Sequence, residues 1–580
     1  MREPFREILL EIFARVTHID FVQTRLRSHL DFLYDAATAA ATETALRELI
    51  ARHRLAAPPH AGPAPALSQR DTLLITYGDQ VTEPGAAPLH TLAEFAATYL
   101  AGVVSGIHIL PFYPWSSDDG FSVKDYFAVD PALGGWDEIR ALGRRFDLMF
   151  DAVFNHMSAE SEWFQRFLRD DPEFRDFFVT VTGHPDLSQV VRPRALPLLT
   201  NFETAAGPRR VWTTFSADQV DLNFKNPQVL RALVAALLFY VAQGARFIRL
   251  DAIAFLWKEI GTPCLHLPQT HHVIQLLRTV LDAAAPQVRL ITETNVPHRD
   301  NISYFGDGTN EAQLVYNFAL PPLVLHTLAM GNAEKLTAWA QSLQLPSDQV
   351  TFFNFLASHD GIGLNPARGI LSPAEIDALV ARATAHGGFV SYKNNPDGTK
   401  SPYELNINYF DALSNPAGGE PLEIQVGRFV VAHGILLALA GLPGIYFHSL
   451  FGSRGDRTGA ESSGIPRRIN RQKLTRAKLE TELEDAASLR AQVFSRLRQL
   501  LERRRNCAAF EPAGTQKVLA VDPRVFAVWR QSPDGRTTAV CLHNVTAETV
   551  MVKVPPPAAA GSGCNATHTL APYAVEWMLA

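Results

Sequence analysis

The chain has 580 residues, of which 47% are hydrophobic and 19% are charged, and this allows a large core and more than one domain. Its net charge of −6 is not gathered into long runs of one sign, so the sequence excludes the basic surface of a nucleic-acid-binding domain. It has no stretch of about 18 uninterrupted apolar residues, and its N-terminal segment MREPFREILLEIFARV lacks the apolar core of a signal peptide. We therefore expect neither a membrane span nor export.

The four cysteines, Cys264, Cys507, Cys541 and Cys564, show no CxxC spacing. In a chain of this size they indicate neither a structural zinc site nor a disulfide framework. A reducing, cytoplasmic location is therefore expected.

Residues 1 to about 55 are predicted to be helical. Leu9, Ile12, Phe13 and Val16 recur at i, i+3, i+4 and i+7, which is the apolar stripe of an amphipathic helix. The segment AAPPHAGPAPALSQR then breaks the pattern and indicates a linker. We expect an N-terminal extension over residues 1–70 that packs as a helical cap on the main domain, with a dimerisation arm as the alternative.

Eight short apolar runs alternate with helical patterns from residue 71 onward. In chain order the runs are TLLITY, VSGIHILPF, DLMFDAVFNH, ARFIRLDAI, VRLITET, AQLVYNF, TFFNFLASHD and GIYFHSL. Runs that are apolar on both faces are typical of parallel strands covered by helices. Eight strand–helix units favour a closed (β/α)8 barrel over an open sheet, and we expect this catalytic barrel to span residues 71–504.

Two connections between predicted strands are too long for ordinary loops, so inserted subdomains are expected at about 157–215 and 361–425. Both leave the carboxyl-terminal end of the strands, where barrel enzymes hold their active sites, and both are expected to form pocket walls. After residue 505, runs such as KVLAVDPRVFAVWR and RTTAVCLHNV alternate like antiparallel strands. Residues 505–580 are therefore predicted to be a small C-terminal β domain.

Four short strings place charged side chains at the ends of predicted strands: DAVFNH at 151–156, RLD at 249–251, ETN at 293–295 and SHD at 358–360. A retaining glycosidase-type site needs a nucleophilic carboxylate and an acid/base about 5–5.5 Å apart. Asp251 is the candidate nucleophile, because Arg249 lies two residues earlier on the same strand and faces the same way. Glu293 is the candidate acid/base, since burial and the Asp251 charge would both raise its pKa.

Asp360 is a third candidate carboxylate, expected to bind sugar hydroxyls and stabilise positive charge on the ring, and His156 is a candidate donor to the same sugar. Taken singly, each of these residues also fits a structural role, such as a core ion pair or a packed histidine. The order of the four strings along the chain favours the catalytic interpretation. No cluster of His and Cys ligands is evident, so we expect proton transfer and covalent catalysis with no metal or cofactor.

The strings DAVFNH, FIRLDAIAF, ITETN and FLASHD resemble the ordered signature regions of the α-amylase superfamily, glycoside hydrolase family thirteen. More narrowly, GIHILPFYPWSSDDGFSVKDY, YNFALPPLVLHTL, ASHDGIG and RRINRQ are similar to its sucrose phosphorylase subfamily. The resemblance covers about residues 72–505. It implies Asp251 as nucleophile, Glu293 as acid/base and Asp360 as transition-state stabiliser.

The resemblance also implies the residues that surround the bound glucose. They are Asp118, Phe121, His156, Phe215, Arg249, His359 and Arg467. In this subfamily phosphate usually attacks the covalent glucosyl-enzyme instead of water and yields α-glucose 1-phosphate. A small sugar substrate and inorganic phosphate as co-substrate are therefore implied as partners.

Four departures from sucrose phosphorylases are similar to the glucosylglycerate phosphorylase branch of the subfamily. They are Thr294-Asn295 after the acid/base, AFLWKE after the nucleophile, KSPYE in the acceptor loop, and the N-terminal extension. Glycerate carries a carboxylate that fructose lacks, so a lysine beside serine in place of an acidic loop residue suits it.

The acceptor loop supplies Lys400, Tyr403 and Glu404 as candidate binding residues. Arg194, Lys393 and Lys400 are the candidates to meet the glycerate carboxylate, and an arginine would do so best through a bidentate pair. The alternative for each lysine is that it only solvates the polar turn NNPDGTK.

Sucrose phosphorylase and glucosylglycerol phosphorylase are the alternatives within this class, and a plain hydrolase is a further one. A non-catalytic, amylase-like binding protein is the alternative from another class. Such proteins usually lose a catalytic carboxylate, whereas all three are present here. The sequence leaves the oligomeric state open between monomer and homodimer.

Overall fold

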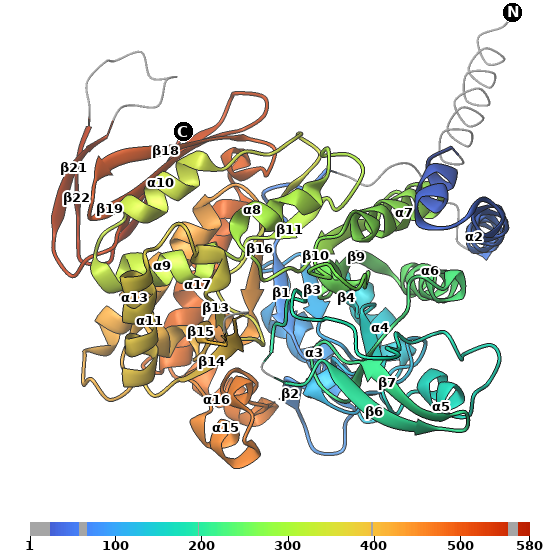
Figure 1. The fold of residues 1–580 in the computed structure, drawn as a ribbon. Coiled ribbons are helices and arrows are strands. Elements are labelled where there is room, and N and C mark those ends of the chain that lie inside the picture. Colours follow the sequence, from blue (N-terminus) through green and yellow to red (C-terminus); the bar gives the residue numbers. More distant parts are fainter. Residues whose placement is uncertain (1–23, 57–65, 195, 396–397, 555–565) are drawn as a thin grey trace, which may run out of the picture.

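Eight parallel strands close into a barrel at the centre of the molecule (Figure 1) in a computed structural model, which describes residues 24–56, 66–194, 196–395, 398–554 and 566–580. In chain order they are β1 (Leu73–Thr76), β3 (Gly106–Ile109), β4 (Asp147–Ala152), β9 (Ala245–Leu250), β10 (Arg289–Thr292), β11 (Leu314–Tyr316), β12 (Thr351–Asn354) and β16 (Leu442–Tyr446). Each strand overlaps one of the eight predicted runs, and β16 pairs with β1 to close the ring. The predicted (β/α)8 barrel is confirmed.

Helices follow the strands and cover the barrel. The main ones are α3 (Pro88–Tyr99), α4 (Trp136–Gly143), α6 (Pro227–Ala242), α7 (Pro268–Ala284), α8 (His298–Asn301), α9 (Leu320–Met330), α10 (Glu334–Ser342), α13 (Leu422–Ala438) and α17 (Leu489–Arg505). Helix α6 illustrates the local cause: the Asn226 side chain accepts a hydrogen bond from the Gln228 N–H, and Pro227 occupies a position that needs no N–H. Val229 and Leu233 lie on its buried side.

The two long connections carry their own small elements. The first contains β5 (His156–Ser158), α5 (Glu162–Leu168), β6 (Leu199–Thr204), β7 (Gly207–Trp212) and β8 (Gln219–Asp221). The second contains β13 (Ile362–Gly363), α11 (Pro373–Ala385), β14 (Phe389–Asn394), β15 (Lys400–Asn406) and α12 (Tyr409–Leu413), and its strands form one antiparallel sheet. After β16 come α14 (Phe447–Leu450), α15 (Arg457–Ser463), the 3-10 turn η5 (Pro466–Asn470) and α16 (Arg476–Glu484).

The C-terminal part is an antiparallel β structure, as predicted. Four strands form one sheet: β18 (Thr515–Asp522), β19 (Val525–Gln531), β20 (Thr538–Asn544) and β23 (Val575–Leu579). A separate pair is formed by β21 (Val550–Val554) and β22 (Ala566–Leu570). Along β21 buried and exposed residues alternate strictly, which is the pattern of a strand with one face on a core. In Figure 1 this part and the β6–β7 hairpin lie on opposite sides of the barrel.

The N-terminal extension packs on the barrel helices. A helix over 24–33 and α2 (Ala36–Ala56) lie beside α6 and α7, and the Tyr34 hydroxyl donates to the Phe224 carbonyl at 2.9 Å. The predicted stripe from Leu9 to Val16, the centre of the predicted linker at 57–65 and residues 555–565 lie outside the described residues.

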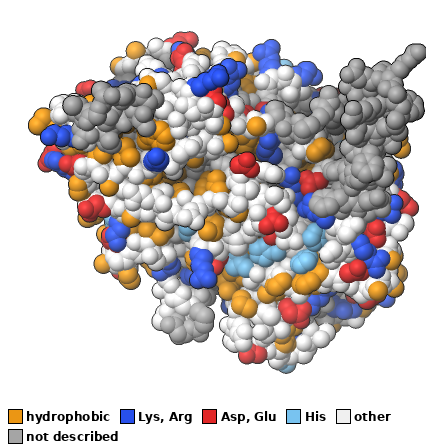
Figure 2. All heavy atoms as spheres, turned by 90° about the horizontal axis from the view of Figure 1, so that it is seen from above, with side chains coloured by type: hydrophobic (Ala, Val, Ile, Leu, Met, Phe, Trp, Pro, Cys, Tyr) orange, Lys and Arg blue, Asp and Glu red, His pale blue; other side chains and the backbone are white. Residues whose placement is uncertain are grey.

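Several surface properties agree with the composition. Positive and negative side chains are interspersed over the face seen in Figure 2. None of the helices in the described ranges is long and apolar enough to cross a membrane. Cys264, Cys507 and Cys541 are buried and are not in disulfides.

Arg504, at the end of α17, joins several parts of the core. Its side chain is 1% exposed and donates to the carbonyls of Gln69, Asp71, Gly441 and Phe510 at 2.5–3.4 Å. These carbonyls precede β1 and β16 or lie in the turn that leads to the C-terminal sheet. One guanidinium thus satisfies backbone groups that would otherwise be buried without a partner.

We therefore expect Arg504→Leu to lower the free energy of unfolding by about 3 kcal/mol or more, because it leaves buried carbonyls unsatisfied. Arg498→Leu, on an exposed position of the same helix, should change it by less than about 0.5 kcal/mol. Urea denaturation followed by circular dichroism measures both. Equal stabilities of the two variants would contradict this account.

Candidate active site

The predicted catalytic residues meet at the carboxyl-terminal ends of neighbouring barrel strands. Asp151 on β4 and Arg249 on β9 are direct partners in the parallel register. Asp251 follows the end of β9, Glu293 follows β10, and Asp360 lies in the segment after β12. Because adjacent parallel strands end at the same edge, residues separated by about 200 positions in the chain come into contact here.

Arg249 is the cation at the centre of this group. Its guanidinium Nη1 lies 2.7 Å from Asp251 Oδ1 and also contacts Asp151, and its Nη2 lies 3.8 Å from Glu293 Oε2. His108 on β3 contacts the other oxygen of Asp151 at 2.7 Å. Burial works to raise the pKa of Asp151, but Arg249 and His108 outweigh it and keep that pKa below its usual value.

Asp251 and Glu293 are the predicted nucleophile and acid/base of a double displacement. Burial raises the pKa of both, Arg249 opposes that rise, and the neighbouring carboxylates add to it. Arg249 lies closer to Asp251 than to Glu293, at 2.7 Å against 3.8 Å. The shorter contact favours the negative charge on Asp251 over Glu293, in the order expected of a nucleophile and a general acid.

The backbone after the nucleophile supports this arrangement. Ala252 has a φ of 48°, in the left-handed region that residues with a Cβ rarely occupy. In this conformation its N–H donates to Glu293 Oε2 at 3.0 Å. A sparsely populated backbone conformation next to the reacting groups is typical of active sites, and here it orients the acid/base.

Asp360 stays ionised because two arginines hold it. Arg467 Nη1 lies 2.7 Å and Arg471 Nη2 lies 3.5 Å from Asp360 Oδ1. Burial alone would raise the pKa of Asp360, but the arginines outweigh it and hold that pKa well below its usual range. A permanent negative charge at this point suits the stabilisation of positive charge on a sugar ring.

Glu404, a predicted binding residue, also forms an ion pair inside the site. It lines the cavity, and its carboxylate is buried. Both carboxylate oxygens accept hydrogen bonds from the Arg467 guanidinium, at 2.9 and 2.6 Å. One of them also accepts a hydrogen bond from the Gly361 N–H at 3.2 Å. Such a bidentate pair fixes a guanidinium in position and direction. Glu404 therefore positions Arg467, and through it Asp360.

Asp118 lies on a tight left-handed turn. Asp118, Asp119 and Gly120 have φ values of 54°, 48° and 109°. Arg194 pairs with Asp118 at 2.8 Å, and Arg471 lies 3.7 Å from Asp118 and 2.7 Å from Asp119. The turn is thus held by ion pairs to distant segments.

His156 and the two predicted aromatic walls line the same cavity. Phe121 stacks on His359 with ring centroids 4.6 Å apart, and Phe215 lies 5.2 Å from the His156 ring. Burial lowers the pKa of His156 and so favours its neutral form. Its Nε2 lies 2.9 Å from the Phe121 carbonyl, to which it can donate a hydrogen bond.

The whole site opens into a cavity of about 850 Å³. Of the predicted residues, Asp118, Phe121, His156, Arg194, Phe215, Asp251, Glu293, His359, Asp360, Tyr403, Glu404 and Arg467 line it. Arg249 lies beneath this surface, in contact with Asp251. The structure thus brings together nearly all of the predicted set.

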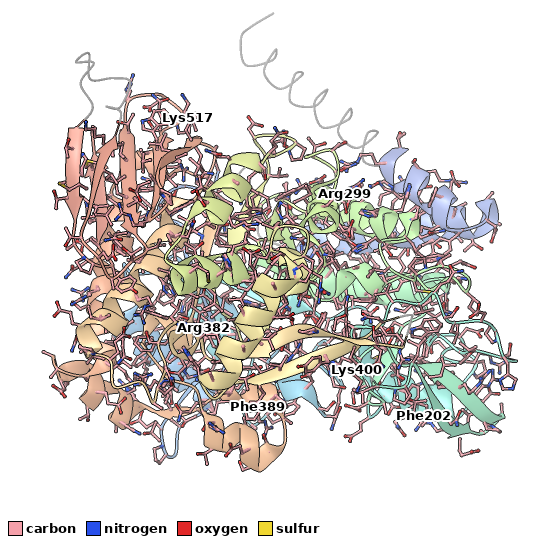
Figure 3. The ribbon with its side chains drawn as sticks, turned by 60° about the vertical axis from the view of Figure 1, so that its left-hand side comes forward. Phe202, Arg299, Arg382, Phe389, Lys400 and Lys517 are labelled. Atoms are coloured by element: carbon pink, nitrogen blue, oxygen red, sulfur yellow. The ribbon has the colours of Figure 1, made fainter. Side chains whose placement is uncertain are left out.

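Lys400 is the exception, because its side chain is exposed and does not line the cavity. It pairs with Asn394 at the tip of the β14–β15 hairpin (Figure 3). The hairpin's other lysine, Lys393, does line the cavity. Arg194, a further candidate for the acceptor carboxylate, is already paired with Asp118.

The structure adds site residues that the sequence analysis missed. Arg192 lines the cavity two positions before Arg194, Gln219 lies 3.2 Å from His156 Nε2, and Arg471 contacts three aspartates. Gln219 and Arg471 act through partners about 60 to 350 residues away in the chain. The string RRINRQ contained Arg471 but gave no reason to separate its three arginines.

Lys258 provides an internal cation next to the site. Its ammonium is buried and lies 2.6 Å from Asn155 Oδ1 and 2.6 Å from Asp221 Oδ2, and it also contacts the Phe255 carbonyl. These oxygens come from the end of β4, from β8 and from the turn after Asp251. One side chain therefore joins the first inserted segment to the barrel.

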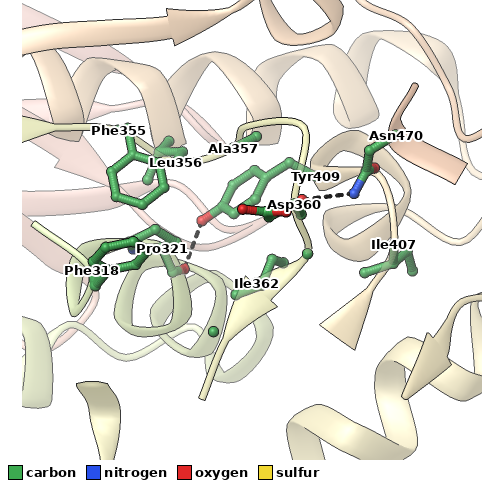
Figure 4. A pocket seen from close by; sticks show the side chains of 12 residues that line it. Phe318, Pro321, Phe355, Leu356, Ala357, Asp360, Ile362, Ile407, Tyr409 and Asn470 are labelled. Atoms are coloured by element: carbon green, nitrogen blue, oxygen red, sulfur yellow. Dashed lines mark hydrogen bonds between the residues drawn. The ribbon is translucent and has the colours of Figure 1, made fainter. Parts of the chain in front are cut away.

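Behind Asp360 the interior is closely packed. Figure 4 shows a void lined by Phe318, Phe355 and Tyr409, of about 10 Å³, which is at the lower limit for one water molecule. Asn470 Nδ2 donates to the Asp360 carbonyl and the Tyr409 hydroxyl donates to the Pro321 carbonyl, both at 2.9 Å. The hydrogen bond from Asn470 thus fixes the backbone of Asp360 on the side away from the cavity.

Comparisons with known proteins agree with this geometry. The family model for the α-amylase catalytic domain matches residues 98–362. A glucosylglycerate phosphorylase of Allomeiothermus silvanus is 55% identical over 479 residues, which cover 83% of this chain and 86% of the relative. The chain belongs to the α-amylase superfamily.

Further phosphorylases are similar to this chain, with lower sequence identity. A glucosylglycerate phosphorylase of Escherichia coli is 50% identical, over 80% of this chain and 83% of its own length. A sucrose phosphorylase of Bifidobacterium adolescentis is 28% identical, over 71% and 81%. The crystal structure of a sucrose 6F-phosphate phosphorylase from Thermoanaerobacter thermosaccharolyticum superposes with a TM-score of 0.73 at 23% identity, covering 87% of this chain and 99% of that one, and so agrees in fold.

Asp251→Asn should lower kcat by roughly 10⁴- to 10⁶-fold, the loss typical of removing a nucleophile. The fold should persist, because Asp151 still pairs with Arg249. Mass spectrometry of Glu293→Gln treated with an activated glucosyl donor should find the glucosyl adduct on Asp251. An adduct on Asp360 or Glu259 would overturn the assignment.

Glu404→Gln should lower kcat by about 10- to 100-fold, because Arg467 loses the partner that holds it on Asp360. The pKa of Asp360 should then rise, so activity should be lost at a higher pH than in the wild type as the solution is acidified. The pH dependence of kcat/KM measures this shift. Glu423→Gln, on the exposed side of α13, is the matched control, and an unmoved acidic limb in Glu404→Gln would contradict the positioning role.

Proposed function

We propose that the protein is a retaining phosphorylase that reversibly converts 2-O-α-glucosylglycerate and phosphate into α-glucose 1-phosphate and glycerate. The observation that carries the proposal is the identity of 50–55% to three glucosylglycerate phosphorylases over most of the chain. It is supported by a site in which a nucleophile, an acid/base and a stabilising carboxylate meet in one cavity.

The geometry indicates how each step would proceed. Asp251, ionised beside Arg249, attacks C1 of the glucosyl group while Glu293 gives its proton to the departing glycerate oxygen. Glycerate leaves, phosphate takes its place, and a phosphate oxygen attacks C1 while its proton passes to Glu293. The bond to Asp251 breaks, and two displacements at one carbon restore the α configuration. Asp360 and Arg467 contact the same sugar ring in this scheme.

Two cations are available for the acceptor carboxylate. Lys393 and Arg192 line the cavity, and within the described ranges neither forms an ion pair with an acidic side chain. Burial lowers the pKa of Lys393, and Arg368 nearby lowers it further. A carboxylate bound beside Lys393 would reverse both effects, because an opposite charge favours the ammonium form. This supports glycerate over the neutral acceptors fructose and glycerol.

No metal or organic cofactor is part of the proposal, and inorganic phosphate is the co-substrate. The internal ammonium of Lys258 supports this, since it supplies a cation where three oxygens converge. A cytoplasmic location and a monomeric or homodimeric state stay predictions from the sequence.

The activity is tested by phosphate-dependent release of glucose 1-phosphate from glucosylglycerate, sucrose, glucosylglycerol and sucrose 6′-phosphate. Glucosylglycerate should have the highest kcat/KM. A higher value for sucrose would make the protein a sucrose phosphorylase, and release of free glucose without phosphate would make it a hydrolase.

Lys393→Met should lower kcat/KM for glucosylglycerate relative to glucosylglycerol by about 10- to 150-fold, the value of a charge-assisted contact of about 1.5–3 kcal/mol. Lys400→Met, at the exposed tip of the same hairpin, should leave that ratio within about twofold of the wild type. Arg192→Met and the double variant show whether the two cations act together. An unchanged ratio in the double variant would refute this account of acceptor choice.

A further inference from the structure

Exposed apolar side chains gather at the mouth of the active-site cavity. Val191, Leu196, Tyr392 and Ile465 all line it, and they are 40%, 47%, 45% and 39% exposed. Single exposed apolar residues are common on soluble proteins. A group of them around one opening indicates a surface that binds an apolar group of a ligand.

These four residues come from three parts of the chain. Val191 and Leu196 belong to the first inserted segment, Tyr392 lies on β14, and Ile465 precedes η5. Other large exposed apolar side chains lie on separate elements, such as Met330 at the end of α9 and Met551 on β21. The convergence on the cavity is therefore a property of the tertiary structure.

Two of the apolar residues stand directly before the two cations proposed for the acceptor carboxylate. Val191 precedes Arg192, and Tyr392 precedes Lys393, and all four side chains line the cavity. A ligand that satisfies both kinds of surface carries a carboxylate and an apolar group close together. Glycerate offers the carboxylate, but its third carbon carries a hydroxyl, so it leaves the apolar surface in water.

The size of the cavity leaves room for such a group. Its volume of about 850 Å³ lies near the upper end of the range of about 300–1,000 Å³ that holds drug-sized ligands. A hexose with a three-carbon acid is smaller than that. An aromatic ring on the third carbon would have space beside Tyr392, and offset or edge-on contact between two rings is favourable.

We propose that the enzyme also transfers glucose to 2-hydroxy acids that carry an apolar group on the third carbon, with 3-phenyllactate as the representative. The proposal rests on the glucosylglycerate phosphorylase activity proposed above, run in the direction of synthesis. Lys393 and Arg192 hold the carboxylate, and the ring lies against Tyr392 and Leu196.

The reaction is balanced with groups already assigned. Asp251 displaces phosphate from α-glucose 1-phosphate and forms the glucosyl-enzyme, while Glu293 protonates the departing phosphate. The 2-hydroxyl of the acid then attacks C1 and its proton returns to Glu293. The bond to Asp251 breaks, and the products are 2-O-α-glucosyl-3-phenyllactate and inorganic phosphate.

The experiment supplies α-glucose 1-phosphate with glycerate, lactate or 3-phenyllactate and measures phosphate release, with mass spectrometry and NMR of the products. Lactate has neither the hydroxyl nor a ring on its third carbon. Comparing glycerate with lactate therefore measures the loss of the hydroxyl, and comparing lactate with 3-phenyllactate measures the gain of apolar contact. We expect 3-phenyllactate to be glucosylated on its 2-hydroxyl with a higher kcat/KM than lactate.

Variants then test the apolar surface. Tyr392→Ser and Leu196→Ser should each lower the ratio of kcat/KM for 3-phenyllactate to that for lactate by about five- to tenfold, the effect of leaving part of a ring in water. Met551→Ser, an exposed apolar position far from the cavity mouth in the chain, should leave the ratio unchanged.

The outcomes separate this inference from the proposed function. Glucosylation of glycerate without any product from 3-phenyllactate would overturn the inference and leave the function standing. Product from 3-phenyllactate but none from glycerate would overturn the function and keep the new activity. Product from neither acid would overturn both, and ratios that do not change in Tyr392→Ser or Leu196→Ser would overturn the assigned site.

Discussion

Arg249 carries one buried positive charge among three carboxylates, and the rest of the site depends on this imbalance. A guanidinium that is 3% exposed is stable in a core only when its charge is matched. Asp151 and Asp251 match that charge directly through Nη1, whereas Glu293 lies farther away, 3.8 Å from Nη2. Burial, together with the negative charge of Asp360, raises the pKa of Glu293 above its usual value.

Two further arginines form ion pairs between the catalytic carboxylates and the pocket walls. Arg467 and Arg471 come from the segment after β16, yet they contact the third carboxylate and the turn at Asp118. Glu404, from the inserted hairpin, fixes Arg467. The barrel therefore sets the chemistry, while ion pairs between insertions set the shape of the sugar site. A shift of the hairpin would reach Asp360 through only two side chains.

The sequence predicted the barrel and the catalytic triplet because both are written in local patterns. Apolar runs mark buried strands, and a spacing of two along one strand places Arg249 and Asp251 on one side. The acceptor side was predicted less well. Lys400 and Lys393 look equivalent in sequence, and only the pairing of β14 with β15 puts one at the tip and the other at the cavity. Gln219 and Arg471 were missed because their partners are distant in the chain, and Arg192 was missed because no local pattern placed it in the cavity.

The ammonium of Lys258 has a consequence for how the first inserted segment stays attached. A bound divalent ion at such a joint would have a dissociation constant, and the joint would weaken as the ion became scarce. A cation carried on the chain is present at the same effective concentration wherever the protein is folded. The attachment of this pocket wall therefore does not depend on the supply of a divalent ion at Lys258.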